Sequence, residues 1–194
     1  MPRPQKFSTE ALTERALVHF WAHGYHATSM DALVRATGLS RHGIYSTLGG
    51  KRALFLACFE RYGALVVTPA FEGVERADAG VDDIAQYFET QISLAETQGL
   101  PGRGCFVGNV ATEVAPADAA VRAKVLAHNT RLRRGFEAVL SRAYDGNGSD
   151  TTAAAEALTV FAQGLWASAR LTEDAGVLRR SARMTLRALK KGLI

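Results

Sequence analysis

The stretch of residues 28–51 constrains the fold of this chain more than any other part of the sequence. Apolar residues keep helical spacing on both sides of a glycine, at Met30, Leu33, Val34, Leu39, Ile44 and Leu48. Gly38 suits a left-handed turn, and Ser29 and Ser40 each stand where an N-cap starts a helix. The sequence therefore predicts two short helices joined by a tight turn, with the second helix over residues 41–46.

A helix-turn-helix pattern alone is only moderately specific, because any pair of helices joined by a tight turn needs the same kinds of residue. A longer set of residues adds to it: Phe20, Gly24, Tyr25, Thr28, Gly38, Ser40, Tyr45, Lys51 and Leu54. This order resembles the N-terminal signature of the TetR family of bacterial transcriptional regulators. Leu48 departs from the family pattern, which usually has Phe there, but it keeps the apolar character.

The resemblance implies that this stretch contacts operator DNA. Tyr45 and Lys51 match the family motif, and a phenol and an ammonium group suit the binding of phosphates. Arg41 and His42 are expected to face base edges. The complete set of expected DNA-contacting residues is Thr28, Ser40, Arg41, His42, Tyr45, Thr47 and Lys51.

The positive charge of the chain lies at the same end. Residues 1–52 carry seven basic and three acidic side chains, which accounts for the whole net charge of +4. This distribution is expected if the N-terminal end meets a polyanion and the remainder does not. A solvated basic surface would give the same count, so the charge alone does not separate the two interpretations.

The rest of the chain has the periodicity of a larger helical body. It predicts helices over residues 51–67, 81–98, 116–143, 152–171 and 176–191, with the connecting helix 51–67 closed by Pro69. With a short helix opening at Gly104 and three helices in the N-terminal part, the expected fold is all-α with about nine helices. We expect a DNA-binding domain at 1–50 and a ligand-binding and dimerisation domain at 51–194.

Several classes of protein are disfavoured by what the sequence lacks. No apolar run approaches the ~20 residues of a membrane-spanning helix and no signal peptide is visible, so we expect a cytoplasmic protein without a membrane partner. The two cysteines, Cys58 and Cys105, are expected to be free thiols. No catalytic set, phosphate-binding glycine loop or cluster of metal ligands is visible, so we expect neither an enzyme nor a metal or cofactor.

The C-terminal body is large enough to enclose a small molecule between its helices. The expected ligand-binding residues are Tyr62, Phe88, Cys105, Phe106, Asn109, His128, Gln163 and Trp166, with Arg170 as a further candidate. Each polar residue could instead be a satisfied core group, and each aromatic residue a core side chain. Because these walls are aromatic with few charges, a mostly apolar or planar inducer is expected rather than a sugar phosphate.

Cys105 has two interpretations. The segment from Gly104 resembles the start of the sixth helix in one branch of the TetR family, with the pattern Gly-Cys-Phe-x-x-Asn ending at Asn109. A thiol at a helix N-terminus beside Arg103 would have a lowered pKa and could sense electrophiles. The alternative is a buried thiol that packs as a small apolar side chain.

The last two helices are expected to form a four-helix dimer interface across a two-fold axis. The expected interface residues are Leu158, Phe161, Ala162, Leu165, Ala169, Leu178, Ala182, Leu186 and Leu189. Two recognition helices would then enter successive major grooves ~34–36 Å apart, so the double-stranded DNA operator should be a rough palindrome.

The sequence thus predicts a homodimeric DNA-binding transcriptional regulator, which by resemblance to the family is a repressor. A small apolar or planar inducer, or an electrophile, would release it from its operator. The alternative is a helical small-molecule-binding or thiol-reactive protein without specific DNA binding.

Overall fold

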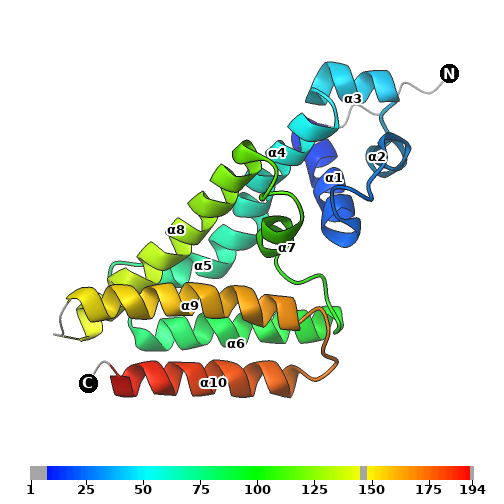
Figure 1. The fold of residues 1–194 in the computed structure, drawn as a ribbon. Coiled ribbons are helices and arrows are strands. Elements are labelled where there is room, and N and C mark those ends of the chain that lie inside the picture. The colour runs from blue at the N-terminus through cyan, green and yellow to red at the C-terminus, as the bar shows by residue number, and fades with distance from the viewer. Residues whose placement is uncertain (1–7, 145–147, 193–194) are drawn as a thin grey trace.

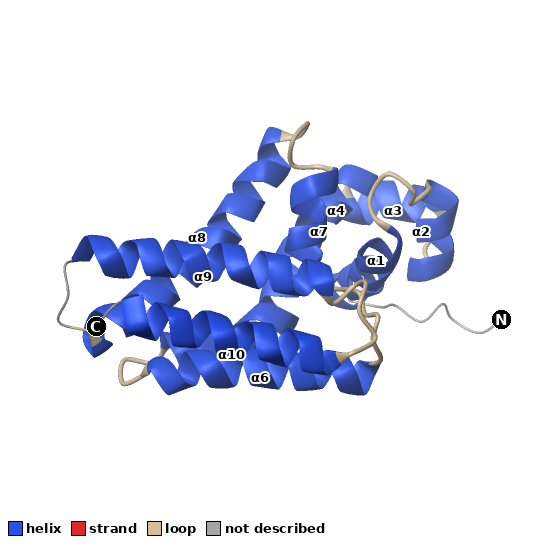
Figure 2. Ribbon diagram, turned by 60° about the horizontal axis from the view of Figure 1, so that its bottom comes forward, coloured by secondary structure: helices blue, strands red, loops and turns tan. Residues whose placement is uncertain are grey.

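The computed structural model describes residues 8–144 and 148–192, and within these ranges the chain is entirely helical and loop (Figure 2). The helices are α1 (Thr9–His23), α2 (Met30–Thr37), α3 (Arg41–Leu48), α4 (Lys51–Tyr62), α5 (Thr68–Glu75), α6 (Val81–Gln98), α7 (Phe106–Glu113), α8 (Ala119–Ala143), α9 (Gly148–Ser168) and α10 (Ala175–Gly192). A π-helical turn, Gly63–Val67, joins α4 to α5. Counting Lys51–Glu75 as one helix gives nine in the described residues, which confirms the all-α prediction.

The expectation that Pro69 ends the connecting helix was wrong, since the helix continues to Glu75. The backbone N–H of Thr68 donates to the carbonyl of Gly63, five residues earlier. In a regular α-helix the proline ring would clash with the carbonyl four residues before it, and the wider π turn relieves this clash. Contrary to expectation, the helix Lys51–Glu75 is long enough and apolar enough to span a membrane. The core helices of globular proteins can have the same length and composition.

The long helix α8 begins three residues later than expected. Pro116 lies in the turn after α7, and Asp118 is the N-cap. The Asp118 carboxylate accepts hydrogen bonds from the backbone N–H groups of Ala120 and Val121 at 3.0 and 3.1 Å. Aspartate is among the preferred N-cap residues, and here it outweighs the helix-starting tendency of the proline.

Two adjoining clusters of buried side chains form the core. In the first, the ring of Phe55 on α4 lies with its centroid 5.0 Å from that of Phe20 on α1 and 5.8 Å from that of Phe106 on α7. The second surrounds Phe71 and Phe136, between α5, α6, α8, α9 and α10. Burying each phenyl ring contributes about 1.5–3 kcal/mol. The first cluster includes side chains on both sides of residue 50, and the domain division there stays a prediction.

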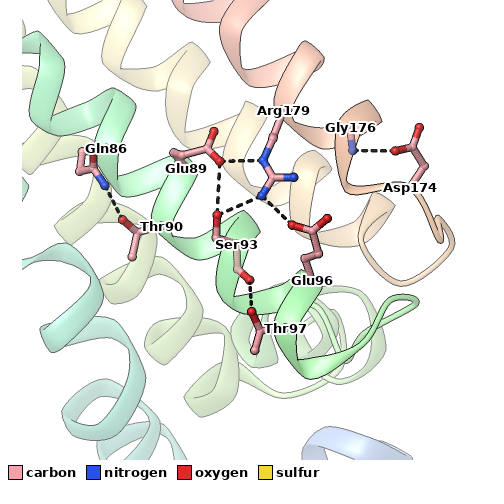
Figure 3. Close-up of polar contacts among 9 residues, drawn as sticks. All are labelled: Gln86, Glu89, Thr90, Ser93, Glu96, Thr97, Asp174, Gly176 and Arg179. Carbon is pink, nitrogen blue, oxygen red and sulfur yellow. Dashed lines mark hydrogen bonds and ion pairs between the residues drawn. The ribbon is translucent and has the colours of Figure 1, made fainter.

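Helices α6, α9 and α10 lie side by side at the end of the molecule opposite α2 and α3 (Figure 1). Figure 3 shows how Arg179 of α10 is held against α6, where its guanidinium donates to Glu89 at 2.6 Å and to Glu96 at 2.7 Å. A third hydrogen bond, of 3.0 Å, reaches the hydroxyl of Ser93. Single exposed ion pairs contribute little, but three contacts from one planar group fix the register of the two helices.

Candidate functional site

Helices α2 and α3 form the predicted helix-turn-helix. The hydroxyls of Ser29 and Ser40 each accept a hydrogen bond from the backbone N–H three residues later, at 3.1 and 3.0 Å. Gly38 ends α2 at φ +76°, in the left-handed region that side chains with a Cβ avoid. Ile44 and Leu48 of α3 are buried, so the opposite side of this short helix faces solvent.

Five of the seven residues expected to contact DNA lie exposed on or beside α3: Ser40, Arg41, His42, Tyr45 and Thr47. The hydroxyl of Ser40 also caps α3. The expectation for Thr28 was wrong, because it is only 1% exposed. Its hydroxyl donates to the carbonyl of Gly24 at 2.6 Å and so stabilises the connection between α1 and α2.

Two cations at this surface already have partners. The guanidinium of Arg41 lies 2.9 Å from the carboxylate of Asp31 on α2, and this hydrogen bond raises the pKa of Arg41. The ammonium of Lys51 lies 4.2 Å from the ring centroid of Tyr25, and burial lowers the pKa of Lys51. The ion pair between Arg41 and Asp31 is largely exposed and therefore weak. A phosphate or a base edge can replace the Asp31 carboxylate as the partner of Arg41.

Contacts from α7 hold the connection between α1 and α2. The carboxylate of Glu113 accepts hydrogen bonds from the backbone N–H groups of Tyr25 at 3.1 Å and His26 at 2.8 Å. The indole N–H of Trp21 on α1 donates to the carbonyl of Gly104, just before α7, at 3.1 Å. A displacement of α7 therefore acts directly on the helix-turn-helix end.

A cavity of about 970 Å³ lies among α1, the π turn, α5, α6, α8 and α9. Five of the predicted ligand-binding residues line it, namely Tyr62, Cys105, His128, Gln163 and Trp166, as does the further candidate Arg170. The volume is within the range of small-molecule sites, and most of the walls are apolar or aromatic.

Three predicted lining residues do not reach the cavity. Phe88 and Phe106 are each 1% exposed and fill the two core clusters. Asn109 lies outside it, where its amide N–H donates to the carbonyl of Arg103 at 2.9 Å and its amide oxygen accepts from Arg170 at 3.2 Å. Helical spacing identified the inward faces of these helices but not which inward residues border empty space.

Trp21 and the face of α6 that borders the cavity were not predicted from the sequence. That face carries Tyr87, Gln91, Leu94 and Gln98, at the i, i+4, i+7 and i+11 spacing of one helical stripe. The two glutamines on this stripe were the available signal. For Trp21 no local pattern distinguishes a wall residue from a core residue.

The thiol of Cys105 serves as the N-cap of α7. Its sulfur accepts hydrogen bonds from the backbone N–H of Gly108 at 3.4 Å and from the hydroxyl of Tyr62 at 3.5 Å. Burial raises the pKa of Cys105 and outweighs these hydrogen bonds, so the expectation of a lowered pKa was wrong. Burial also raises the pKa of Cys58, and both cysteines are free thiols, as expected.

The imidazole of His128 on α8 is neutral at physiological pH. Burial and the nearby charge of Arg131 lower the pKa of His128 to about 4. A neutral imidazole can both donate and accept one hydrogen bond to a ligand in the cavity. Within the described residues, no three His, Cys, Asp or Glu side chains gather as a metal site.

Both parts of the chain match known families. Residues 10–58 match the bacterial regulatory proteins of the tetR family, and residues 80–185 match the tetracyclin repressor-like C-terminal domain. The chain belongs to the TetR family. It is a DNA-binding transcriptional regulator and not an enzyme, as the sequence predicted.

Individual relatives extend this similarity over nearly the whole TetR-family chain. The HTH-type transcriptional repressor ComR of Escherichia coli (strain K12) is 28% identical over 190 residues, which cover 95% of this chain and 90% of ComR. The structure of a TetR-family regulator from Streptomyces coelicolor has a TM-score of 0.75 at 25% identity, covering 96% of this chain and 97% of that one. The regulator CifR has a TM-score of 0.80 at 22% identity, with coverage of 96% and 99%.

Most of the residues expected at a dimer interface face the interior of this TetR-family protomer instead. Those buried in its own core are Leu158, Ala162, Leu165, Ala169, Leu178 and Ala182. Phe161, Leu186 and Leu189 are partly buried against the same core. The apolar stripe read from the sequence is thus the inner face of α9 and α10, because burial against α6 and α8 requires the same spacing as burial against a partner.

The outer faces of α9 and α10 carry a second apolar stripe. On α9 it includes Ala153, Ala157, Gly164 and the 69% exposed Val160. On α10 it includes Val177 and Met184, which are 41% and 64% exposed. On α9 these residues recur at intervals of three or four, so this helix presents one continuous, mostly small-residue surface to solvent. On α10 the two apolar residues are two turns apart, with the polar Arg180 and Ser181 between them.

Proposed function

We propose that this protein is a repressor that binds a palindromic operator as a homodimer and leaves it when a small inducer enters the central cavity. The observation that carries this proposal is the outer face of α3, which presents Arg41, His42, Tyr45 and Thr47 to solvent on a capped helix-turn-helix. ComR is named as a repressor, and CifR is described in complex with a 26bp double-strand operator DNA. Both support the assignment.

The roles on DNA divide by chemistry. Tyr45 and Lys51 hold phosphates, while Arg41 and His42 face base edges, with Arg41 exchanging Asp31 for its target. Ser40 and Thr47 lie at the two ends of the same exposed surface.

The dimer forms through the outer faces of α9 and α10, where two copies make a four-helix interface. Small residues on the α9 stripe allow close approach of the helices, while Val160 and Met184 bury exposed apolar area. α3 lies far from these helices in each protomer (Figure 1), so two copies hold two recognition helices apart, as the ~34–36 Å between successive major grooves requires.

The inducer acts by favouring a protomer shape with the wrong spacing of recognition helices. Trp21 of α1 is part of the cavity wall, and Glu113 of α7 holds the α1–α2 connection. A ligand that displaces either element therefore changes the angle of the DNA-binding end. We propose a noncovalent, mostly apolar or planar inducer, because the neutral Cys105 thiol favours packing over reaction with an electrophile. The pattern from Gly104 to Asn109 supports a place in the Gly-Cys-Phe-x-x-Asn branch of the family.

Selection of bound sequences from random DNA duplexes, followed by titration of the selected operator, tests the DNA-binding assignment. Lys51→Ala should weaken binding to all DNA sequences. It should also reduce by about 1 the slope of the logarithm of the binding constant against the logarithm of the salt concentration. Arg41→Ala should reduce by about 1–3 kcal/mol the binding free energy that favours the correct base over the others at one position of the operator. Arg134→Ala, on the exposed side of α8, is the matched control and should change neither. A wild-type protein without sequence-selective binding would leave the helical small-molecule-binding alternative.

A further inference from the structure

Among the described residues, the charged side chains that line the cavity are all cationic. Arg103 and Arg170 are part of its wall, and no aspartate or glutamate of these residues is. His128 is neutral because burial lowers its pKa. The cavity therefore offers two positive charges and no negative one to whatever enters it.

The side chain of Arg170 packs against the segment that carries Arg103. The side chain of Arg170 crosses Gly104 so closely that a Cβ there would lie 2.8 Å from its Cγ. Asn109 accepts a hydrogen bond from the guanidinium of Arg170 at 3.2 Å and donates one to the backbone carbonyl of Arg103 at 2.9 Å. The guanidinium of Arg103 lies 5.9 Å from the ring centroid of Trp21.

Neither guanidinium has a carboxylate within ion-pair distance in residues 8–144 and 148–192. Arg179 and Arg180, in the neighbouring α10, both pair with carboxylates. Arg103 and Arg170 thus keep unused N–H donors at the cavity wall, and guanidinium groups bind carboxylates in a planar, two-pronged geometry.

The remainder of the cavity suits an uncharged body. The other polar side chains of the wall, such as Gln91 and Gln163, are uncharged. Trp166, Leu65 and Leu94 supply apolar surface around the cavity. A ligand with one acidic end and an apolar body matches this arrangement.

We propose that the cavity binds a small organic monocarboxylate, with its carboxylate at Arg103 and Arg170 and its apolar body against Trp166 and Leu94. This inference rests on the proposed function only in taking the cavity as the inducer site. A cationic ligand would meet two unopposed positive charges. A neutral ligand of the same shape would leave the guanidinium donors to water and gain nothing from them.

The test uses a matched pair of probes, 4-phenylbutyrate and its neutral amide 4-phenylbutanamide, with octanoate as an aliphatic acid. Both tryptophans of the protein, Trp21 and Trp166, line the cavity, so their fluorescence reports on binding directly. We expect 4-phenylbutyrate to bind about tenfold more tightly than the amide in the wild type. This preference should shrink as salt concentration rises.

The double variant Arg103→Gln, Arg170→Gln should bind the acid and the amide equally, while Arg134→Gln should behave as the wild type. If the double variant does not fold, as judged by circular dichroism, the acid-to-amide ratio in the wild type decides alone. Equal binding of acid and amide, or binding of neither acid, overturns the proposal. The wild-type operator titration is independent of these probes, so failure here leaves the DNA-binding assignment standing.

Discussion

The carboxylate of Glu113 in α7 accepts a hydrogen bond from the backbone N–H of His26 across 2.8 Å. Its other oxygen accepts from Tyr25, so one side chain from the C-terminal body binds two successive backbone groups beyond the end of α1. With the hydrogen bond between Trp21 and Gly104, this makes two direct connections from the cavity region to the DNA-binding end. The angle between the two parts therefore depends on α7 as well as on the long connecting helix.

Replacing Glu113 by Ala should destabilise the protein by about 1–3 kcal/mol, because two backbone donors lose a charged acceptor. The measurement is the free energy of unfolding in urea. Glu72→Ala, an exposed glutamate on α5, is the matched control and should have little effect. Equal stabilities of the two variants would show that water replaces the carboxylate without cost.

The inner and outer faces of α9 should respond differently to a charge. Val160→Glu places a carboxylate on the exposed face, so the protein should fold but sediment as a monomer with little specific DNA affinity. Leu165→Glu places it in the core, where Leu165 is 3% exposed, and should cost several kcal/mol of folding stability. A folded Val160→Glu variant that sediments as a dimer would remove this face from the interface.

His128 should make stability depend on pH between its ordinary pKa of about 6.5 and its folded pKa of about 4. In this window the unfolded chain binds the proton more readily than the folded one, so stability falls as pH decreases from 6.5 to 4. The loss should be on the order of 2–3 kcal/mol. In His128→Gln this loss of stability between pH 6.5 and 4 should be absent from urea unfolding measured as a function of pH. If the variant shows the same pH dependence as the wild type, the burial of the neutral imidazole is contradicted.

Cys105 should react slowly, because burial raises the pKa of its thiol and its sulfur already accepts two hydrogen bonds. We expect iodoacetamide at neutral pH to modify it more slowly than a free cysteine peptide, and the wild type to remain on its operator during treatment. Cys105→Ser should behave in the same way. Release of the wild type alone would restore the electrophile-sensing interpretation.

The features that the sequence predicted well are local. Ser29 and Ser40 cap their helices and Gly38 turns the chain, because each needs only its own neighbours. The features that it predicted badly depend on distant contacts. Leu158 and Val160 both belong to apolar stripes of α9, and only the packing of α6 and α8 determines which stripe is buried. Thr28 was similarly taken for a surface residue, although a carbonyl four residues earlier binds its hydroxyl.

The cavity illustrates the same limit from another side. Tyr62, Gln163 and Trp166 were predicted to line it and do, since inward helix faces can be recognised by their spacing. Phe106 lies on an equally inward face but fills the core. Empty space results from the sum of all packed volumes and has no signature in any one segment.

The π turn at Gly63–Val67 has a consequence for insertions and deletions in this helix. Consecutive side chains of a regular α-helix point about 100° apart, yet residues 65–67 and 69–71 all border the cavity. The wider turn accommodates one additional residue without changing the alignment of the helical segments on either side. A related chain that lacks this residue would return to a regular helix and would then have to replace Pro69, so the width of the cavity wall and the presence of the proline should change together.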